Sequence, residues 1–204
     1  MFLHRLILNP LNTQARRDLA SRYELHRTLV AALAPDADVP PTQRYLWRLE
    51  MAVDGVPQLL VQTPEPADWS RLERIHRGYC KDVAANKPVP LNAIESGRRF
   101  SFRLHASPSR VREGRRVNLV TEGDQLAWLD RVSRENGFTV LKCTRGRDYT
   151  ESSRKSDGNV LALAVAEFDG VLEVDDAEKV RSALGAGLGR GKAFGLGLLS
   201  LGRL

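Results

Sequence analysis

The sequence contains little cysteine and no long apolar run. Its two cysteines, Cys80 and Cys143, are far apart and form no CxxC pair, which excludes a paired-cysteine zinc motif and a disulfide framework. No segment approaches the roughly 18 to 20 consecutive apolar residues that a membrane-spanning helix needs. The short apolar segment Phe2–Leu8 is not followed by the small-residue cleavage site of a signal peptide. We therefore expect reduced thiols in a soluble, cytoplasmic protein that has no membrane partner.

Charge, by contrast, is plentiful and unbalanced. The formal net charge is +6 over 204 residues and comes mostly from arginine, whose planar fork of donors suits phosphate groups. The hydrophobic fraction of 42% and the charged fraction of 27% are those of an ordinary globular protein. From Glu95 onward, 19 basic residues stand against 15 acidic ones, so the surplus is mainly C-terminal. A folded protein with an anionic partner is expected.

Hydrophobic periodicity in the first half predicts strand, helix, hairpin, helix and strand in that order. The helix after the first strand is either continuous or broken near Ser21, and Asp54-Gly55 marks the hairpin turn. This β-α-β-β-α-β order is that of a ferredoxin-like module. The expected elements are a strand at 2–8, a helix at 13–33, strands at 45–53 and 56–62, a helix at 69–77 and a strand at 80–84.

The second half repeats this order without visible sequence identity. Its segment 160–174 is either one long bent strand or two strands, because Asp169-Gly170 favours a turn within it. The other expected elements are a strand at 99–106, a helix at 124–136, a strand at 138–143, a helix at 175–184 and a strand at 196–201. The predicted fold class is α+β, with two tandem ferredoxin-like (RRM-like) domains at residues 1–84 and 95–204 and a proline-containing linker at 85–94.

Basic residues gather in two segments of the second half. One contains a single acid, Glu113, and the other falls on an expected hairpin and its flank. Such groups are typical of surfaces that contact RNA phosphates, although a solvated arginine-rich surface is the alternative. The first group is Arg98, Arg99, Arg103, Arg110, Arg112, Arg115 and Arg116, and the second is Lys142, Arg145, Arg147, Arg154 and Lys155.

A glycine-rich run at residues 185–197 is the most unusual local sequence. It fails the Walker A pattern, because Ala186 and Ala193 stand where Gly and Ser or Thr are needed, and it follows a helix rather than a strand, unlike a Rossmann turn. It is either a tight helix-to-strand turn or a loop whose backbone approaches a phosphate, with Arg190 and Lys192 adding charge. The glycines concerned are Gly187, Gly189, Gly191, Gly195 and Gly197.

Tyr23 and His26 form the candidate chemical centre. Ser21 and Glu24 fit a capping box, so a helix is expected to begin there, and the i, i+3 spacing makes the pair neighbours that face outward beside Arg22 and Arg27. Histidine titrates near neutral pH and can transfer protons. By spacing alone, an ordinary tyrosine and a surface histidine remain the alternative.

Four motifs together resemble a known family, and one of them is Arg16-Arg17-Asp18-Leu19. The others are Leu8-Asn9-Pro10, the stretch from Tyr23 to Leu29 that reads YELHRTL, and Gly187-Leu188-Gly189 separated by five residues from Gly195-Leu196-Gly197. They are similar to motifs of the repeat-cleaving endoribonuclease subunit of type I-E Cascade complexes. The resemblance implies tandem ferredoxin-like domains, binding of the stem-loop of CRISPR repeat RNA, cleavage at the 3′ base of the stem, and assembly with other Cascade subunits.

The resemblance makes Tyr23 and His26 the expected catalytic residues of a metal-independent endoribonuclease without a cofactor. The RNA 2′-hydroxyl attacks the adjacent phosphate, leaving a 2′,3′-cyclic phosphate and a 5′-OH. His26 serves as general base or general acid, and Tyr23 orients the phosphate or takes the complementary role. Arg22, Arg27 and Lys155 stabilise the developing charge. The competing hypothesis is a non-catalytic, RRM-like scaffold that caps a guide RNA.

Overall fold

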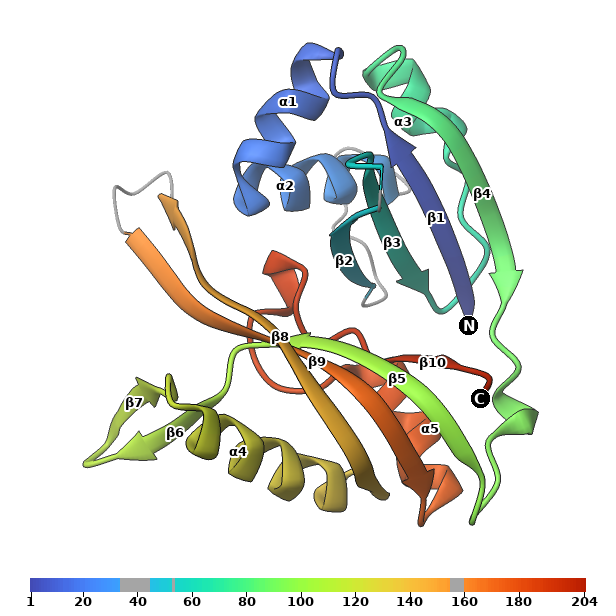
Figure 1. Ribbon diagram of the computed structural model, residues 1–204. Coiled ribbons are helices and arrows are strands. Elements are labelled where there is room, and N and C mark those ends of the chain that lie inside the picture. Colours follow the sequence, from blue (N-terminus) through green and yellow to red (C-terminus); the bar gives the residue numbers. More distant parts are fainter. Residues whose placement is uncertain (34–44, 53, 155–159) are drawn as a thin grey trace. The chain divides into compact units, whose positions relative to one another are not determined.

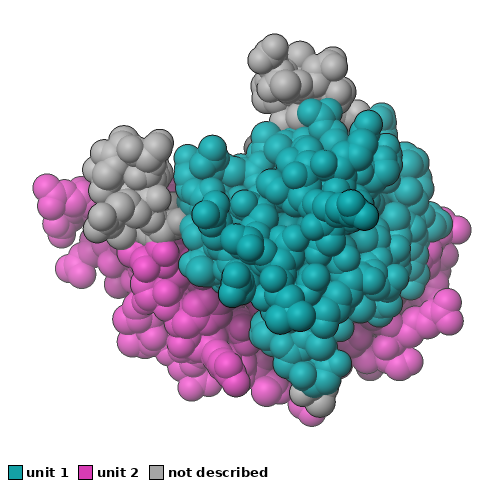
Figure 2. Space-filling model, turned by 90° about the horizontal axis from the view of Figure 1, so that it is seen from above, with its two compact units in different colours: residues 1–89, 153–159, 193–195 teal, residues 90–152, 160–192, 196–204 magenta. Residues whose placement is uncertain are grey.

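The computed structural model describes residues 1–33, 45–52, 54–154 and 160–204. The chain divides into two compact units, which Figure 2 colours separately. Unit 1 comprises residues 1–89, 153–159 and 193–195, and unit 2 comprises residues 90–152, 160–192 and 196–204. The fold class is α+β, with two four-stranded antiparallel sheets. Within the described ranges, no helix is long and apolar enough to cross a membrane.

Unit 1 has one four-stranded sheet with the strand order β2-β3-β1-β4 (Figure 1). The strands β3 and β4 both pair antiparallel with β1, which therefore lies inside the sheet. Its elements are β1 (Phe2–Leu8), α1 (Thr13–Ala20), α2 (Arg22–Leu33), β2 (Leu46–Met51), β3 (Pro57–Thr63), α3 (Ser70–Ile75) and β4 (Cys80–Pro88).

The core of unit 1 forms between α2 and one face of this sheet. Alternate residues of β1 are buried, among them Leu6 and Leu8, as the period of two in a strand requires. Leu25 and Leu29, four residues apart on α2, are buried in the same cluster with Trp47 of β2. Each fully buried leucine contributes roughly 1.5 to 3 kcal/mol. This packing fixes the rotation of α2 and hence the direction in which Tyr23 and His26 project.

Unit 2 has a second four-stranded sheet with the order β10-β5-β9-β8, and a separate two-stranded hairpin, β6-β7 (Figure 1). Trp128 of α4 stacks on Phe168 of β9 with ring centroids 6.2 Å apart, in a core shared with α5. The elements are β5 (Arg99–Ala106), β6 (Ser109–Arg112), β7 (Arg115–Asn118), α4 (Glu122–Glu135), β8 (Phe138–Arg154), β9 (Val160–Val174), α5 (Ala177–Ala186) and β10 (Ser200–Gly202), with short 3-10 helices at Leu91–Ala93 and Lys192–Phe194.

Most expected elements of the first half are confirmed. The strand at 2–8 has the expected bounds, and the helix is broken at Ser21, whose backbone is extended with φ −147° and ψ 111°. The hairpin of β2 and β3 forms as expected, with residue 53 outside the described residues. The strand expected at 80–84 is longer, because β4 continues to Pro88 and so includes residues 85–88, which were expected in the linker.

Segment 160–174 takes the first of its two expected forms, whereas the second half differs from expectation at β8, which continues beyond Cys143 to Arg154, at β10 and at the hairpin β6-β7. Segment 160–174 is one strand, and Gly170 permits close approach rather than a turn, because an added Cβ would lie 1.9 Å from the carbonyl oxygen of Lys142. The strand expected at 196–201 is wrong for its first four residues, since β10 begins at Ser200 and the Gly197 amide instead donates to the carbonyl of His105. The β6-β7 hairpin, with positive φ at Glu113 and Gly114, was not expected.

Candidate functional site

The helix α2 carries Tyr23 and His26 in unit 1. The side-chain oxygen of Ser21 accepts a hydrogen bond from the Glu24 amide at 3.4 Å, as the capping box predicts. The helix therefore starts at Arg22, and Tyr23 and His26 fall one turn apart. Both side chains are half-buried rather than fully turned outward.

Tyr45, immediately before β2, contacts the imidazole of His26. Its hydroxyl oxygen lies 2.9 Å from Nδ1 of His26 and 3.5 Å from the His26 carbonyl oxygen, which accepts a hydrogen bond from it. The centroids of the two rings are 5.9 Å apart, and the ring planes are tilted by 30° to one another. With the Tyr45 hydroxyl donating to the His26 carbonyl, Nδ1–H can donate to the Tyr45 oxygen, and this tautomer leaves the lone pair of Nε2 to accept a proton from a substrate. Sequence reasoning missed Tyr45, because 19 residues separate it from His26 and only packing brings them together.

Burial shifts the pKa values of both His26 and Tyr45. It lowers the pKa of His26 below the usual 6.5, so the imidazole is mainly neutral at neutral pH. It also raises the pKa of the Tyr45 phenol far above 10, so that hydroxyl keeps its proton. A neutral imidazole can accept a proton, as a general base must.

The arginines beside the pair have different surroundings. Arg22 lies over the ring of Trp47, with its guanidinium carbon 5.6 Å from the ring centroid, a cation–π contact. Gly195 packs against the same two residues, because an added Cβ would lie 2.6 Å from Cζ3 of Trp47 and 3.0 Å from Nη1 of Arg22. The exposed Arg27 pairs with Glu24 at 3.3 Å. The glycine-rich run therefore contacts the residue that precedes Tyr23.

The first basic group of unit 2 is mostly exposed and partly paired with acids. On β5, Nε of Arg99 lies 2.6 Å from a carboxylate oxygen of Glu173, and Nε of Arg103 lies 2.6 Å from one of Asp169; both acids are on β9. Such exposed ion pairs are weak, so phosphate can replace the acid. Arg115 and Arg116 are exposed on β7. Further pairs join Arg98 to Glu95, Arg110 to Asp124 and Arg112 to Glu113 at 3.7 to 3.9 Å.

The second basic group is less uniform than its sequence suggests. The side chain of Arg145 is only 14% exposed and pairs with Asp148 and Glu122, which raise its pKa. Lys142 and Arg147 are exposed. Arg154 ends β8 with its side chain outside the description, and Lys155 lies outside the described residues.

The remaining glycines of the run have the positive φ that the sequence anticipated. Gly187, Gly189, Gly191 and Gly197 have φ between 72° and 85°. At Gly197 a Cβ would also lie 2.5 Å from the carbonyl oxygen of Leu188, so the turn needs glycine for packing as well. Among the described residues, no group of three or more His, Cys, Asp and Glu side chains is placed to hold a metal ion.

Comparison with known proteins relates the whole chain to one family. The family described as CRISPR associated protein matches residues 1–203. The CRISPR-associated endoribonuclease Cse3 of Thermus thermophilus is 41% identical, with 98% of this chain and 99% of that protein covered. The structure of CRISPR endoribonuclease Cse3 bound to 19 nt RNA has a TM-score of 0.88 and 40% identity over 98% of this chain and 99% of that one.

A chain of a solved CRISPR RNA-guided surveillance complex is also similar, at 25% identity and a TM-score of 0.65 over 100% of both chains. The similarity therefore extends over both units. The chain belongs to the CRISPR-associated protein family.

Proposed function

We propose that this protein is an endoribonuclease that binds the stem-loop of CRISPR repeat RNA and cleaves precursor crRNA at the 3′ base of the stem. The observation that carries the proposal is 41% identity over nearly the whole chain to a CRISPR-associated endoribonuclease. The half-buried His26, hydrogen-bonded to Tyr45 on a helix flanked by arginines, supports catalysis rather than binding alone.

The proposed reaction needs no metal, because RNA supplies its own nucleophile. His26 takes the proton of the 2′-hydroxyl as its oxygen attacks the adjacent phosphorus. The bond from phosphorus to the 5′-oxygen breaks, that oxygen gains a proton, and the products are a 2′,3′-cyclic phosphate and a 5′-OH. The lowered pKa of His26 favours the base role. Tyr23 orients the phosphate or protonates the leaving oxygen, and Arg22, Arg27 and Lys155 stabilise the developing charge.

RNA binding is assigned to the two basic groups of unit 2 and to Arg190 and Lys192 in the glycine-rich run. Exposure of most of the first group and the weakness of its ion pairs support this assignment. Arg145 is the weakest member, since two acids already compensate its charge. We also propose that the protein joins other Cascade subunits in the cytoplasm, where its RNA substrate is transcribed.

We assign a ferredoxin-like fold to each unit. The β-α-β-β-α-β order and the strand orders β2-β3-β1-β4 and β10-β5-β9-β8 support this assignment. We place the domain boundary within residues 85–94, and because β4 continues to Pro88, the first domain extends beyond the expected residues 1–84 to the end of that strand, before a second domain of residues 95–204. The first stretch of unit 1 ends at residue 89, inside that range, which agrees with this placement.

Replacement of His26 tests the proposal. Labelled repeat RNA is incubated with the wild type, His26→Ala and the matched control His76→Ala, whose histidine is the C-cap of α3 and lies beside the ring of Tyr79. We expect His26→Ala to bind RNA normally and to lose cleavage by roughly 10² to 10⁴-fold, as removal of a general base does. His76→Ala should cut like the wild type. Bound but uncut RNA with the wild type would instead support the scaffold function.

A further inference from the structure

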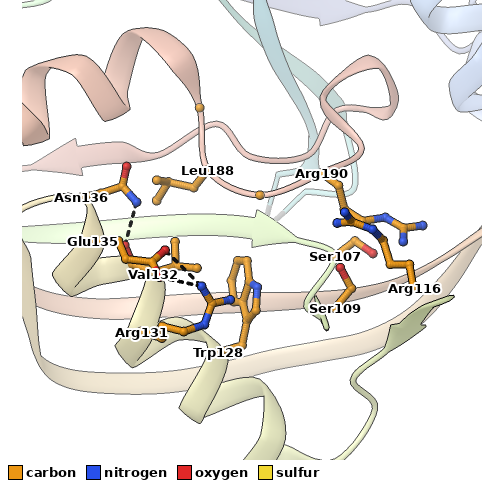
Figure 3. A pocket seen from close by; sticks show the side chains of 12 residues that line it. Ser107, Ser109, Arg116, Trp128, Arg131, Val132, Glu135, Asn136, Leu188 and Arg190 are labelled. Carbon is orange, nitrogen blue, oxygen red and sulfur yellow. Dashed lines mark hydrogen bonds and ion pairs between the residues drawn. The ribbon is translucent and has the colours of Figure 1, made fainter. Parts of the chain in front are cut away.

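Unit 2 contains an open pocket of about 360 Å³ beside the glycine-rich run. Residues from the turn after β5, from β7, from α4 and from the run line it (Figure 3). The run is held there by Leu188, which is 2% exposed, and by Gly189, whose added Cβ would lie 3.1 Å from Cζ2 of Trp128. Arg190 follows directly, so the packing of these two residues places its side chain at the pocket.

Two arginines converge on one end of this pocket. Arg190 and Arg116 come from different elements, and their side chains approach one another in Figure 3. Burial lowers the pKa of Arg190, and the positive charge of Arg116 lowers it further, as it does only when the groups are close. Neither arginine forms an ion pair with an acid in the described part of the chain, and Glu135 in the lining is paired with Arg131 at 2.8 Å. Two close cations without an acid favour an anion between them.

The same end of the pocket presents a buried hydroxyl. Ser107 is 0% exposed, and its Oγ has no hydrogen-bond partner among the described residues. Leaving a buried hydroxyl unsatisfied costs roughly 1 to 3 kcal/mol, so such groups usually face a ligand or water. Ser109, 8% exposed, lies beside it in the lining. Hydroxyl donors together with arginine forks form a set that suits the oxygens of a phosphate.

We propose that Arg116, Arg190 and Ser107 form a phosphate-binding site that holds one phosphodiester of the bound RNA. This inference rests on the proposed function for the source of the phosphate, whereas the anion chemistry follows from the pocket itself. The Ser107 hydroxyl donates to one phosphate oxygen, and the two guanidinium groups bind the others. The glycine-rich run thus contributes to RNA binding through the position it gives Arg190.

The first experiment uses inorganic phosphate as the probe. Thermal unfolding of the full chain is followed with increasing phosphate, with ionic strength held constant by sodium chloride. We expect the wild-type midpoint to rise with phosphate, because a ligand that binds only the folded state stabilises it. Arg190→Gln and Ser107→Ala should lose most of that rise. Arg134→Gln is the matched control, since Arg134 is also an arginine near the end of α4 but is exposed and outside the lining.

The second experiment measures affinity for repeat RNA over a series of salt concentrations. Arg190→Gln should bind about tenfold more weakly than the wild type, as loss of a charged hydrogen bond predicts. Its slope of log affinity against log salt should be shallower by about 0.7 to 0.9, the contribution of one phosphate. Arg134→Gln should keep the wild-type slope, and Arg190→Lys, which retains the charge, should recover part of the affinity.

Equal phosphate responses in Arg190→Gln and Arg134→Gln would overturn the site. A phosphate response lost in Arg190→Gln with unchanged RNA affinity would overturn the assignment to RNA. If the wild type binds no repeat RNA, the proposed function fails, yet the phosphate experiment still decides whether the anion site exists.

Discussion

The hydroxyl of Tyr45 connects the candidate catalytic histidine to the edge of the sheet in unit 1. Because it occupies Nδ1 of His26 at 2.9 Å, it restrains the rotation of the imidazole and determines which nitrogen exchanges a proton. Tyr45 itself keeps its proton, since burial raises its pKa. We therefore regard Tyr45 as a positioning residue rather than an acid or base.

Replacing Tyr45 by phenylalanine keeps the ring and removes this hydrogen bond. We expect the rate of the chemical step to fall about five- to tenfold, as loss of roughly 1 kcal/mol predicts, while RNA affinity is unchanged. In the wild type the rate should rise with pH through a pKa below 6.5 and then level off, because the neutral imidazole is the active form. The midpoint of this rise should shift in Tyr45→Phe. A purely structural role would lower stability without moving it.

The buried imidazole of His4 leads us to expect a separate effect of pH on the stability of the folded protein. It is fully buried where the pairing of β1 with β4 shifts register, and its Nδ1 accepts a hydrogen bond from the Asn86 amide at 3.0 Å. Nε2 lies 2.8 Å from Oγ1 of Thr63, so both nitrogens are occupied in the neutral ring. Burial lowers the pKa to about 4 in the folded protein, against about 6.5 when unfolded.

The unfolded chain therefore binds one more proton between pH 6.5 and pH 4. Stability should be fully present above pH 6.5 and should fall as pH decreases to 4, by roughly 2 to 3 kcal/mol from this group. Urea unfolding of the wild type and of His4→Gln at pH 7 and pH 4.5 measures the free energy of unfolding of each protein at each pH. The loss between these two pH values should be smaller in His4→Gln. An equal loss in both proteins would show that His4 does not titrate in this way.

The end of the glycine-rich run depends on Gly195. Its φ of +76° and its contacts with Trp47 and Arg22 leave no room for a side chain. Gly195→Ala should destabilise the protein by roughly 1 to 3 kcal/mol and slow RNA cleavage, because Trp47 and Arg22 must move. Gly185→Ala is the matched control, since Gly185 lies in α5 with open space around it, and should stabilise by up to about 1 kcal/mol. Equal melting temperatures for the two variants would contradict this account.

The elements that the sequence predicted well have a local pattern. The strands β1 and β5 have the expected bounds because each contains a short apolar pattern: β1 buries alternate residues, and β5 buries Phe102 and Leu104 on either side of the exposed Arg103. The hairpin β6-β7 has no such pattern, since its strands are mainly exposed and rich in arginine. The full length of β8 was missed for the same reason, because it continues beyond Cys143 through polar residues. Exposed strands have no alternating hydrophobic pattern in their sequence, so only their backbone pairing with a neighbouring strand identifies them.

The residues of the candidate site also fall into those that a local sequence pattern predicts and those that only long-range packing brings together. Tyr23 and His26 were predictable as neighbours, because helical spacing is local and Ser21 fixes where the helix begins. Tyr45, the contact of Gly195 with Arg22, and the convergence of Arg116 and Arg190 depend on long-range packing. The pairing of Arg145 with two acids depends on it too, and this changes how much of its charge is available to RNA.

Taken as a whole, the molecule combines a surplus of six positive charges with one histidine site on an N-terminal helix. In the proposed function, the basic residues bind RNA and His26 takes part in cutting it, so binding and cleavage should be separable by mutation. A change in the RNA can separate binding from cleavage just as a mutation in the protein can, because the proposed nucleophile is the 2′-hydroxyl of the RNA.

The decisive measurement uses repeat RNA that carries a single 2′-deoxy nucleotide at the cut site. Binding and cleavage by the wild-type protein are measured in EDTA, beside the unmodified RNA. The unmodified RNA should be cut to a 2′,3′-cyclic phosphate and a 5′-OH, and the deoxy RNA should bind with equal affinity and stay intact. Cleavage of the deoxy RNA, or loss of all cleavage in EDTA, would contradict attack by the 2′-hydroxyl with His26 as the base.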